Sequence, residues 1–199
     1  VEVYALAAFS LAGDVPAART ALDLGSGSGV VGLLLASAGL AVKGVERDRA
    51  WRALSRASAR LSAFTLDVLP GTVEKGRVRP SPAPVDLVVC NPPWFEPAAG
   101  PVSPDRRRAA ARTMLRASVA DFVDAGLLLA PRVCIVTRVE RQAMLDRPGA
   151  HLARWARLGR KVILAEVRRG PGAGAEETLD LAAAYARFGR SFNPAGRGA

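Results

Sequence analysis

The chain has 199 residues, half of them hydrophobic, and its 28 Lys and Arg outnumber 18 Asp and Glu to give a formal charge of +10. This length and composition allow one sizeable hydrophobic core and predict a single domain over 1–188, followed by a basic, glycine-rich tail over 189–199. Because no apolar run reaches the roughly 18 residues that span a bilayer, and the start lacks the basic segment of a signal peptide, we exclude a membrane protein and expect a cytoplasmic one.

The positive charge suits a polyanionic partner such as nucleic acid, since each phosphate that a protein neutralises releases counterions. Nearly all of this charge is arginine, alongside abundant Ala, Gly and Pro, and the base composition of the genome would also explain such a sequence. The charge therefore gives modest support to a nucleic-acid partner.

Metal and Ser/His chemistry have few candidate residues in this sequence. Cys90 and Cys134 both lie in apolar, strand-like runs, which predicts buried, reduced thiols rather than a disulfide. The single histidine, His151, falls on a predicted surface helix. We therefore expect no metal site.

The first part of the chain predicts a helix over 3–11, a buried strand over 20–24, a glycine loop over 25–29 and a helix over 30–38. Because the chain opens directly on a helix without a Met, we expect that some N-terminal residues are missing. The loop glycines let the backbone approach a ligand, and the helix behind them presents oriented N–H groups. Asp23, which precedes the loop, would repel a pyrophosphate but attract an ammonium group.

Acidic residues are expected at the ends of the next two strands. A strand over 41–45 leads to Glu46, 21 positions after Gly25, where a carboxylate is placed to accept hydrogen bonds from both ribose hydroxyls. A helix over 49–61 and a short strand over 64–66 follow, and Asp67 would lie at that strand's tip, near an adenine amino group. Each acid could instead be a solvated or helix-capping carboxylate.

The residues after the next predicted strand could bind an amino group. The apolar run 87–90 predicts a central strand, and two prolines end it at Asn91. The side-chain and main-chain carbonyls of Asn91 can accept both hydrogens of a planar amino group, on whose ring Trp94 could stack. The alternative is an ordinary strand-ending turn with a core Trp.

Taken in order, these motifs resemble the amino-methylating branch of the class I S-adenosylmethionine-dependent methyltransferases, over roughly residues 3–168. The resemblance implies a Rossmann-like α/β fold, a mostly parallel sheet with helices on both faces, and S-adenosylmethionine as cofactor. It implies that the methionine moiety of the cofactor lies near Asp23, Gly25, Ser26, Gly27 and Gly29, the ribose near Glu46, and the adenine near Asp67. It also implies that the reacting amine is held by Asn91, Pro92, Pro93 and Trp94, and that Asn91 contacts the cofactor as well.

A finer resemblance lies beyond these prolines. Asn91-Pro92-Pro93-Trp94-Phe95, Ser103-Pro104-Asp105-Arg106 and Ala111-Arg112-Thr113 are similar to the bacterial adenine-N6 methyltransferases of valine tRNA, although Trp94 stands where Tyr is usual. This implies a tRNA substrate, with Trp94, Phe95, Arg106, Arg108 and Arg112 in contact with it. Arg108 and Arg112 share a helix face and could clamp phosphate or simply be solvated. The alternatives are methylation of guanine N2 in ribosomal RNA or of glutamine N5 in a protein, and a non-catalytic protein that binds RNA or a partner.

The last third predicts a helix from these arginines through 129, a strand over 133–136, a helix over 140–158 that Pro148-Gly149 interrupts, and a strand over 161–167. For 176–188, helical spacing of apolar residues competes with the antiparallel strand that the implied fold would place there, and both alternatives stay open.

Overall fold

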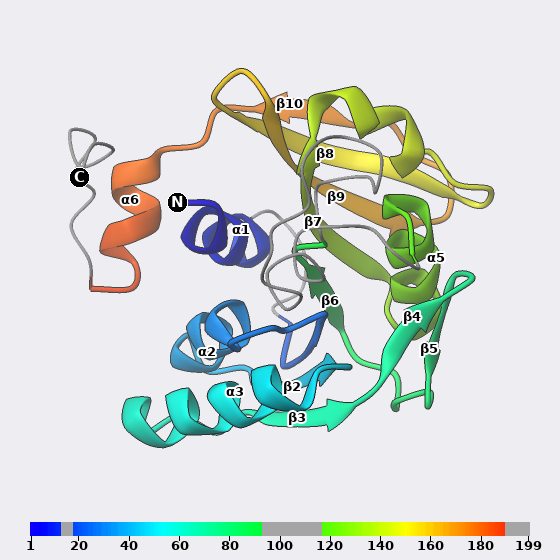
Figure 1. Ribbon diagram of the computed structural model, residues 1–199. Helices are drawn as coiled ribbons and strands as arrows, with labels where there is room; N and C mark the ends of the chain where they lie inside the picture. The colour runs from blue at the N-terminus through cyan, green and yellow to red at the C-terminus, as the bar shows by residue number, and fades with distance from the viewer. Residues whose placement is uncertain (13–17, 93–116, 190–199) are drawn as a thin grey trace, which may run out of the picture.

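The computed structural model describes residues 1–12, 18–92 and 117–189, which are built around one eight-stranded sheet (Figure 1). The strand order across the sheet is β10-β8-β9-β7-β6-β1-β2-β3. The strands are β1 (Thr20–Leu24), β2 (Ala41–Glu46), β3 (Asp67–Pro70), β6 (Leu87–Cys90), β7 (Arg132–Arg138), β8 (Ala150–Leu158), β9 (Val162–Arg169) and β10 (Ala175–Glu177), and a separate hairpin pairs β4 (Thr72–Glu74) with β5 (Arg77–Arg79).

The sheet is mostly parallel, as expected. β3, β2, β1, β6 and β7 run in one direction, and β9 lies antiparallel between β7 and β8. After β1 the chain builds outward through β2 and β3, then returns to the other side of β1 with β6 and β7. The strand order therefore reverses between β1 and β6, and the carboxyl ends of strands at such a point are where open α/β sheets bind ligands.

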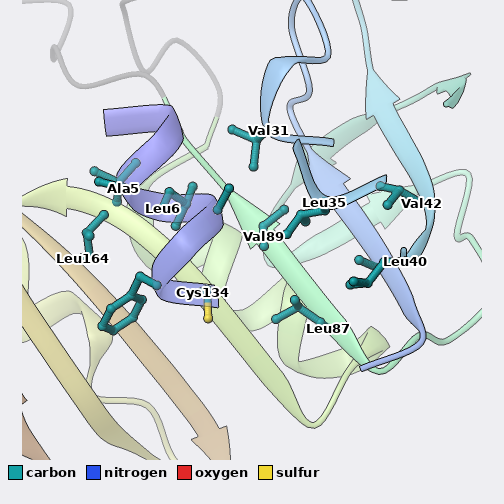
Figure 2. Close-up of a cluster of buried hydrophobic side chains, with 14 of the residues drawn as sticks. Ala5, Leu6, Val31, Leu35, Leu40, Val42, Leu87, Val89, Cys134 and Leu164 are labelled. Atoms are coloured by element: carbon teal, nitrogen blue, oxygen red, sulfur yellow. The ribbon is translucent and has the colours of Figure 1, made fainter. Parts of the chain in front are cut away.

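Helices cover both faces of the sheet because its central strands are apolar on both sides. In β6, Leu87 and Val89 belong to one core cluster and Val88 and Cys90 to the other, and all four are fully buried. The first cluster contains residues of α1 and α2 (Figure 2), together with Ala59 of α3. The second contains residues of α5 and of the β4–β5 hairpin. The helices are α1 (Glu2–Leu11), α2 (Val30–Ser37), α3 (Arg49–Ser62), α5 (Val119–Leu129) and α6 (Leu181–Ala186), with a 3-10 helix, η1 (Val139–Leu145).

Most elements that have strong local signals are confirmed. These are the helices α1, α2 and α3, the strands β1, β2, β6, β7 and β9, and the end of α5 at Leu129. Cys90 and Cys134 are buried and free, as predicted, and burial raises the pKa of the Cys134 thiol to about 12.

The predicted third strand is misplaced by several residues. Ala63 ends α3 in the left-handed conformation with φ of 58°, and the chain needs residues 63–66 to return to the sheet. β3 therefore begins at Asp67, and the strand-like residues Phe64 and Thr65 lie exposed in the connection.

The helix predicted over 140–158 is wrong, because this stretch forms η1 and then β8. A bulge shifts the pairing of β8 with β9 between Leu152 and Arg154. On either side of it, Leu152 and Trp155 pack against the same core cluster, so apolar side chains on one face of the strand are three residues apart. That spacing is also typical of a helix, which explains the wrong prediction. His151 therefore lies on a strand and not on a helix.

The segment 176–188, for which helix and strand were both left open, contains the end of a short strand and a short helix. Residues 175–177 form β10, which pairs parallel with β8, and residues 181–186 form α6. The antiparallel strand of the fold is β9, which lies earlier in the chain.

α5 begins at Val119, and residues 117 and 118 before it are not helical, so the helix predicted from Arg106 does not run unbroken through Leu129. Ser118 caps α5, with its hydroxyl accepting from the Asp121 N–H at 3.2 Å and its own N–H donating to the Asp121 carboxylate at 2.8 Å. The arginine-rich start of the predicted helix, and the tail from 190 on, lie outside the described residues.

Candidate functional site

The glycine loop after β1 is built on three left-handed residues, Gly25, Gly27 and Gly29, with φ of 74°, 52° and 82°. A Cβ on Gly29 would lie 2.3 Å from Ser55 Oγ and 2.8 Å from a methyl carbon of Leu66, so the loop is pressed against α3 and its connection. Within the described part of the chain, and apart from its two chain neighbours, no heavy atom lies within 4 Å of the Cβ position of Gly27. The loop thus has a packed side at Gly29 and an open side at Gly27.

This difference predicts different effects for two matched substitutions. We expect Gly29→Ala to lower the free energy of unfolding by about 2–5 kcal/mol, because it combines an unfavourable φ with overpacking. Gly27→Ala should cost only about 1–2 kcal/mol, the backbone penalty alone, but should weaken binding of a ligand on the open side of the loop. Urea unfolding and calorimetry with the cofactor measure the two effects, and equal losses of stability would contradict this description of the loop.

Glu46, at the tip of β2, holds the loop from the side. Its Oε2 accepts the N–H of Gly27 at 3.0 Å and its Oε1 accepts the N–H of Asp48 at 2.8 Å. The residue is 9% exposed, so its carboxylate is largely withdrawn from water but not sealed off. Each carboxylate oxygen can accept a second hydrogen bond, which leaves acceptors for two neighbouring hydroxyl groups.

Asp23 lies beneath the loop and not in front of it. It is 2% exposed, and its Oδ2 accepts the N–H of Gly32 in the first turn of α2 at 3.0 Å. Burial raises the pKa of Asp23 from 3.8 to about 7, the Gly32 N–H opposes this shift, and the charge of Glu46 adds to it. Asp23 was expected to attract an ammonium group, but one of its two carboxylate oxygens already accepts a hydrogen bond that joins β1 to α2.

The raised pKa of Asp23 predicts how stability depends on pH. The folded protein keeps this proton up to about pH 7, whereas the unfolded chain releases it near 3.8. The free energy of unfolding should therefore fall as pH rises between these two values, by up to about 4 kcal/mol, and stay level above them. In Asp23→Asn, whose amide oxygen can still accept the Gly32 N–H, this decline should disappear. Urea unfolding from about pH 5 to 8 tests it, and parallel curves for the two proteins would contradict it.

Asp67 does not lie where the sequence predicted. It is the first residue of β3 and pairs with Lys43 of β2, whereas the tip of β3 is Pro70, opposite Glu46. Three residues of strand, roughly 10 Å, separate Asp67 from that tip. The adenine contact expected for Asp67 is therefore not supported by its position.

Asn91 follows β6 at the point where the strand order reverses. Cys90 pairs with Leu24 of β1, and Leu24 pairs with Val45 of β2. Asn91, Gly25 and Glu46 are the next residues on three adjacent parallel strands, so they stand in a row across the ligand-binding edge, roughly 5 Å from one strand to the next. Asn91 is half-buried and Pro92 is buried. Pro93, Trp94, Phe95, Arg106, Arg108 and Arg112 lie outside the described residues.

Two supporting interactions of this site were missed from the sequence. Asp48 caps α3 by accepting the N–H of Ala50 and Trp51, while its own N–H donates to Glu46. An Asp directly before a helical pattern was a readable signal for this cap.

Ser26, predicted as a cofactor contact, has its hydroxyl directed at β2, where a Cβ on Gly44 would lie 2.9 Å from it. That hydroxyl has no hydrogen-bond partner among the described residues, and no sequence signal links it to Gly44.

Among the described residues, no helix is both long enough and apolar enough to cross a bilayer. Across 1–12, 18–92 and 117–189, no three His, Cys, Asp or Glu side chains are grouped as metal ligands would be.

Comparison with known proteins agrees with this geometry. Residues 7–129 match the model of the family described as "Methyltransferase small domain". No curated protein matches the sequence.

Three solved structures share the fold. They are a putative RNA methyltransferase from Pyrococcus horikoshii (17% identity, TM-score 0.61, covering 85% of this chain and 83% of that one), magnesium protoporphyrin IX methyltransferase from Synechocystis with bound S-adenosylmethionine (17%, 0.57, 85% and 78%), and a ribosomal protein L11 methylase from Lactobacillus delbrueckii (15%, 0.59, 84% and 78%). At these identities the likeness shows the fold alone.

Proposed function

The chain belongs to the methyltransferase small domain family and is a class I S-adenosylmethionine-dependent methyltransferase, and from this premise we propose that it methylates an exocyclic amino group, N6 of adenine in tRNA. The observation that supports this most strongly is the row formed by Asn91, Gly25 and Glu46 across three adjacent strands. In this row the amide of Asn91 can hold the amine, and it lies beside the glycine loop and Glu46, which can hold the methyl donor.

The described residues fit the cofactor on two points. The open side of Gly27 leaves room for a ligand against the loop, and Glu46 has acceptors to spare beside it. We assign the ribose hydroxyls to Glu46 and the methionine moiety to the loop glycines, with Asp23 fixing the loop from below. When bound, S-adenosylmethionine supplies an electrophilic methyl group on a sulfonium.

Asn91 has a defined task in this scheme. An aryl amine is a weak nucleophile because its lone pair is delocalised into the ring. Acceptors on both of its hydrogens favour a pyramidal nitrogen, and a stacked aromatic such as Trp94 would hold the ring so that the lone pair faces the methyl group. The amine loses a proton to water after transfer, so a base with a tuned pKa is not required.

An RNA substrate is supported by charge and by the sequence motifs. The formal charge of +10 suits a phosphate-rich partner, and the residues from Asn91 to Thr113 resemble those of tRNA adenine-N6 methyltransferases. The base would have to be splayed out of its stem or loop to reach the sheet edge. Membership of an enzyme family speaks against the non-catalytic alternative, whereas guanine N2 and glutamine N5 remain the competing acceptors.

The deciding experiment is methylation by the full-length protein with labelled cofactor. Total tRNA, ribosomal RNA and release factor are offered separately, and the labelled RNA is digested and analysed by nucleoside. We expect N6-methyladenosine in tRNA. N2-methylguanosine in ribosomal RNA, or label in the protein, would overturn the assignment in favour of the corresponding alternative.

A further inference from the structure

Helix α3 starts at the proposed cofactor site and carries an unusual surface. It follows the tip of β2, and its capping residue Asp48 donates to the carboxylate of Glu46. Along its 14 residues only Ser55 and Ala59 are buried, so most of the helix faces outward (Figure 1). The helix therefore presents a long surface that begins beside the cofactor site.

Four arginines and no acidic residue occur within α3. Arg49, Arg52, Arg56 and Arg60 are spaced by three, four and four positions. At about 100° per residue they fall within an arc of roughly 80°, and they extend over about 16 Å of the helix axis. They form one continuous line of positive charge, which we call the α3 arginine ridge.

The positive charge of the ridge is not neutralised by acidic side chains of the described residues. Arg52 is anchored at the site, because its Nη1 donates to the main-chain oxygens of Glu46 and Arg47 at 2.8 and 2.6 Å. Arg49, Arg56 and Arg60 are exposed, and across the described ranges none of them has a carboxylate within ion-pair distance. Elsewhere the chain pairs arginine with acid repeatedly; examples are Arg147 with Asp124, Arg157 with Glu176 and Arg138 with Glu140.

The ridge also acts against the helix that carries it. Arg52 and Arg56, and Arg56 and Arg60, are like charges four residues apart, which repel each other on a helix surface. Arg49 and Arg52 lie in the first turn, where the helix dipole disfavours positive charge. Arg60 lies in the last turn, where the helix dipole favours a positive charge, but helix stability does not account for the other three arginines. An external polyanion would remove both penalties.

Apolar side chains are exposed near the far end of the ridge. Leu61 is 90% exposed and Phe64, just beyond the helix, is 41% exposed. Aromatic side chains beside a positively charged groove or ridge are used to stack unpaired bases. This favours a nucleic acid with accessible bases over a simple polyanion.

We propose that the α3 arginine ridge binds the phosphate backbone of the RNA substrate and leads it to the sheet edge where the target base is methylated. The inference rests on the proposed function, since it takes RNA as the substrate. Arg49 lies at the cofactor end of the ridge and Arg60 at the distal end, so the RNA would run from the site along the outer surface of α3.

The test compares two double substitutions that remove the same charge. Arg56→Gln/Arg60→Gln affects the ridge, and Arg160→Gln/Lys161→Gln affects the exposed β8–β9 turn at the other end of the sheet. Binding of fluorescein-labelled tRNA to the full-length proteins is measured by anisotropy over a range of salt concentrations. We expect the ridge variant to bind about 5- to 20-fold more weakly and to lower the slope of log affinity against log salt by about 1.5–2, whereas the control variant stays close to wild type.

Further measurements separate RNA binding from the fold and from the proposed function. Affinity for S-adenosylmethionine and the thermal midpoint should be unchanged in both variants, which separates RNA binding from damage to the fold. Equal effects of the two double substitutions, or no binding of tRNA by the wild-type protein, would overturn the ridge proposal. A wild-type protein that binds tRNA through the ridge but methylates only release factor would instead overturn the proposed function.

Discussion

Replacing Asn91 with Ala should lower kcat for methyl transfer by at least about 10²- to 10³-fold, while the affinity for S-adenosylmethionine stays within a factor of about three. β6, which precedes Asn91, and β2, which carries Glu46, lie on opposite sides of β1. Asn91 can therefore hold an amine without contacting the ribose site at Glu46. Single-turnover assays with tRNA and calorimetry with the cofactor measure the two quantities separately.

Asn91→Asp is the matched control for this prediction. The carboxylate has the same shape and keeps acceptor atoms for the amine, so it should lose less activity than Ala does. Equal loss of activity and cofactor affinity in Asn91→Ala would show that Asn91 supports the cofactor pocket and does not hold the amine.

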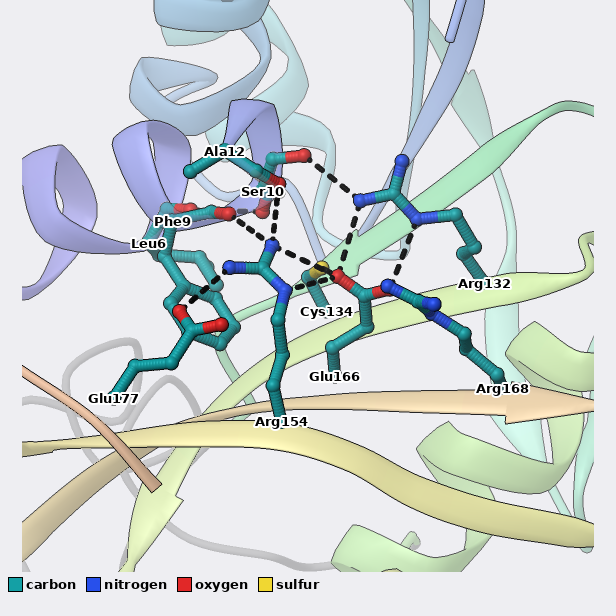
Figure 3. A network of polar contacts seen from close by, with 10 residues as sticks. All are labelled: Leu6, Phe9, Ser10, Ala12, Arg132, Cys134, Arg154, Glu166, Arg168 and Glu177. Atoms are coloured by element: carbon teal, nitrogen blue, oxygen red, sulfur yellow. Dashed lines mark hydrogen bonds and ion pairs between the residues drawn. The ribbon is translucent and has the colours of Figure 1, made fainter. Parts of the chain in front are cut away.

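Removing Glu166 should have the largest effect on stability. Its carboxylate is fully buried and accepts hydrogen bonds from the guanidinium groups of Arg132, Arg154 and Arg168 (Figure 3). In Glu166→Ala, the buried Arg132 would lose its carboxylate partner and Arg154 would keep only Glu177, which we expect to cost about 3–5 kcal/mol. For a chain of this size the thermal midpoint should fall by roughly 10 °C.

Glu176→Ala is the control for Glu166→Ala. Glu176 forms an ion pair with Arg157 at 2.9 Å, but both side chains are about half exposed, so the loss should stay below about 1 kcal/mol. Calorimetric melting of the two variants tests the contrast, and similar midpoints would mean that the buried network contributes no more than a surface pair.

Local sequence signals were sufficient for the part of the site built on β1, β2 and β6. The glycines after β1, the acid ending β2 and the prolines after β6 each dictate backbone geometry within a few residues, and parallel strands bring their ends to one edge. Asp67 was misplaced because the length of the connection depends on where α3 ends, and Ala63 ends it without the glycine that usually marks such a position.

Features that depend on distant contacts were not readable. The bulge in β8 is visible only in its pairing with β9, and it changed the apparent period of the sequence. The partners of Glu166 come from three different strands, and Arg132 is 34 positions away in the chain. Neither hydrophobic spacing nor composition indicates which arginines are buried and paired.

The network around Glu166 also determines when the first helix can become stable. Arg132 donates to the carbonyl of Ser10, and Arg154 donates to those of Phe9 and Ala12, so strands from late in the chain cap the carboxyl end of α1 (Figure 3). Near the other end of α1, Tyr4 stacks on Tyr185 of α6 at 4.6 Å between ring centroids. During synthesis on the ribosome, α1 therefore lacks these partners until β7, β8 and α6 have been made, the nearest contact being 122 positions later. We expect α1 and these distant elements to fold in one cooperative event.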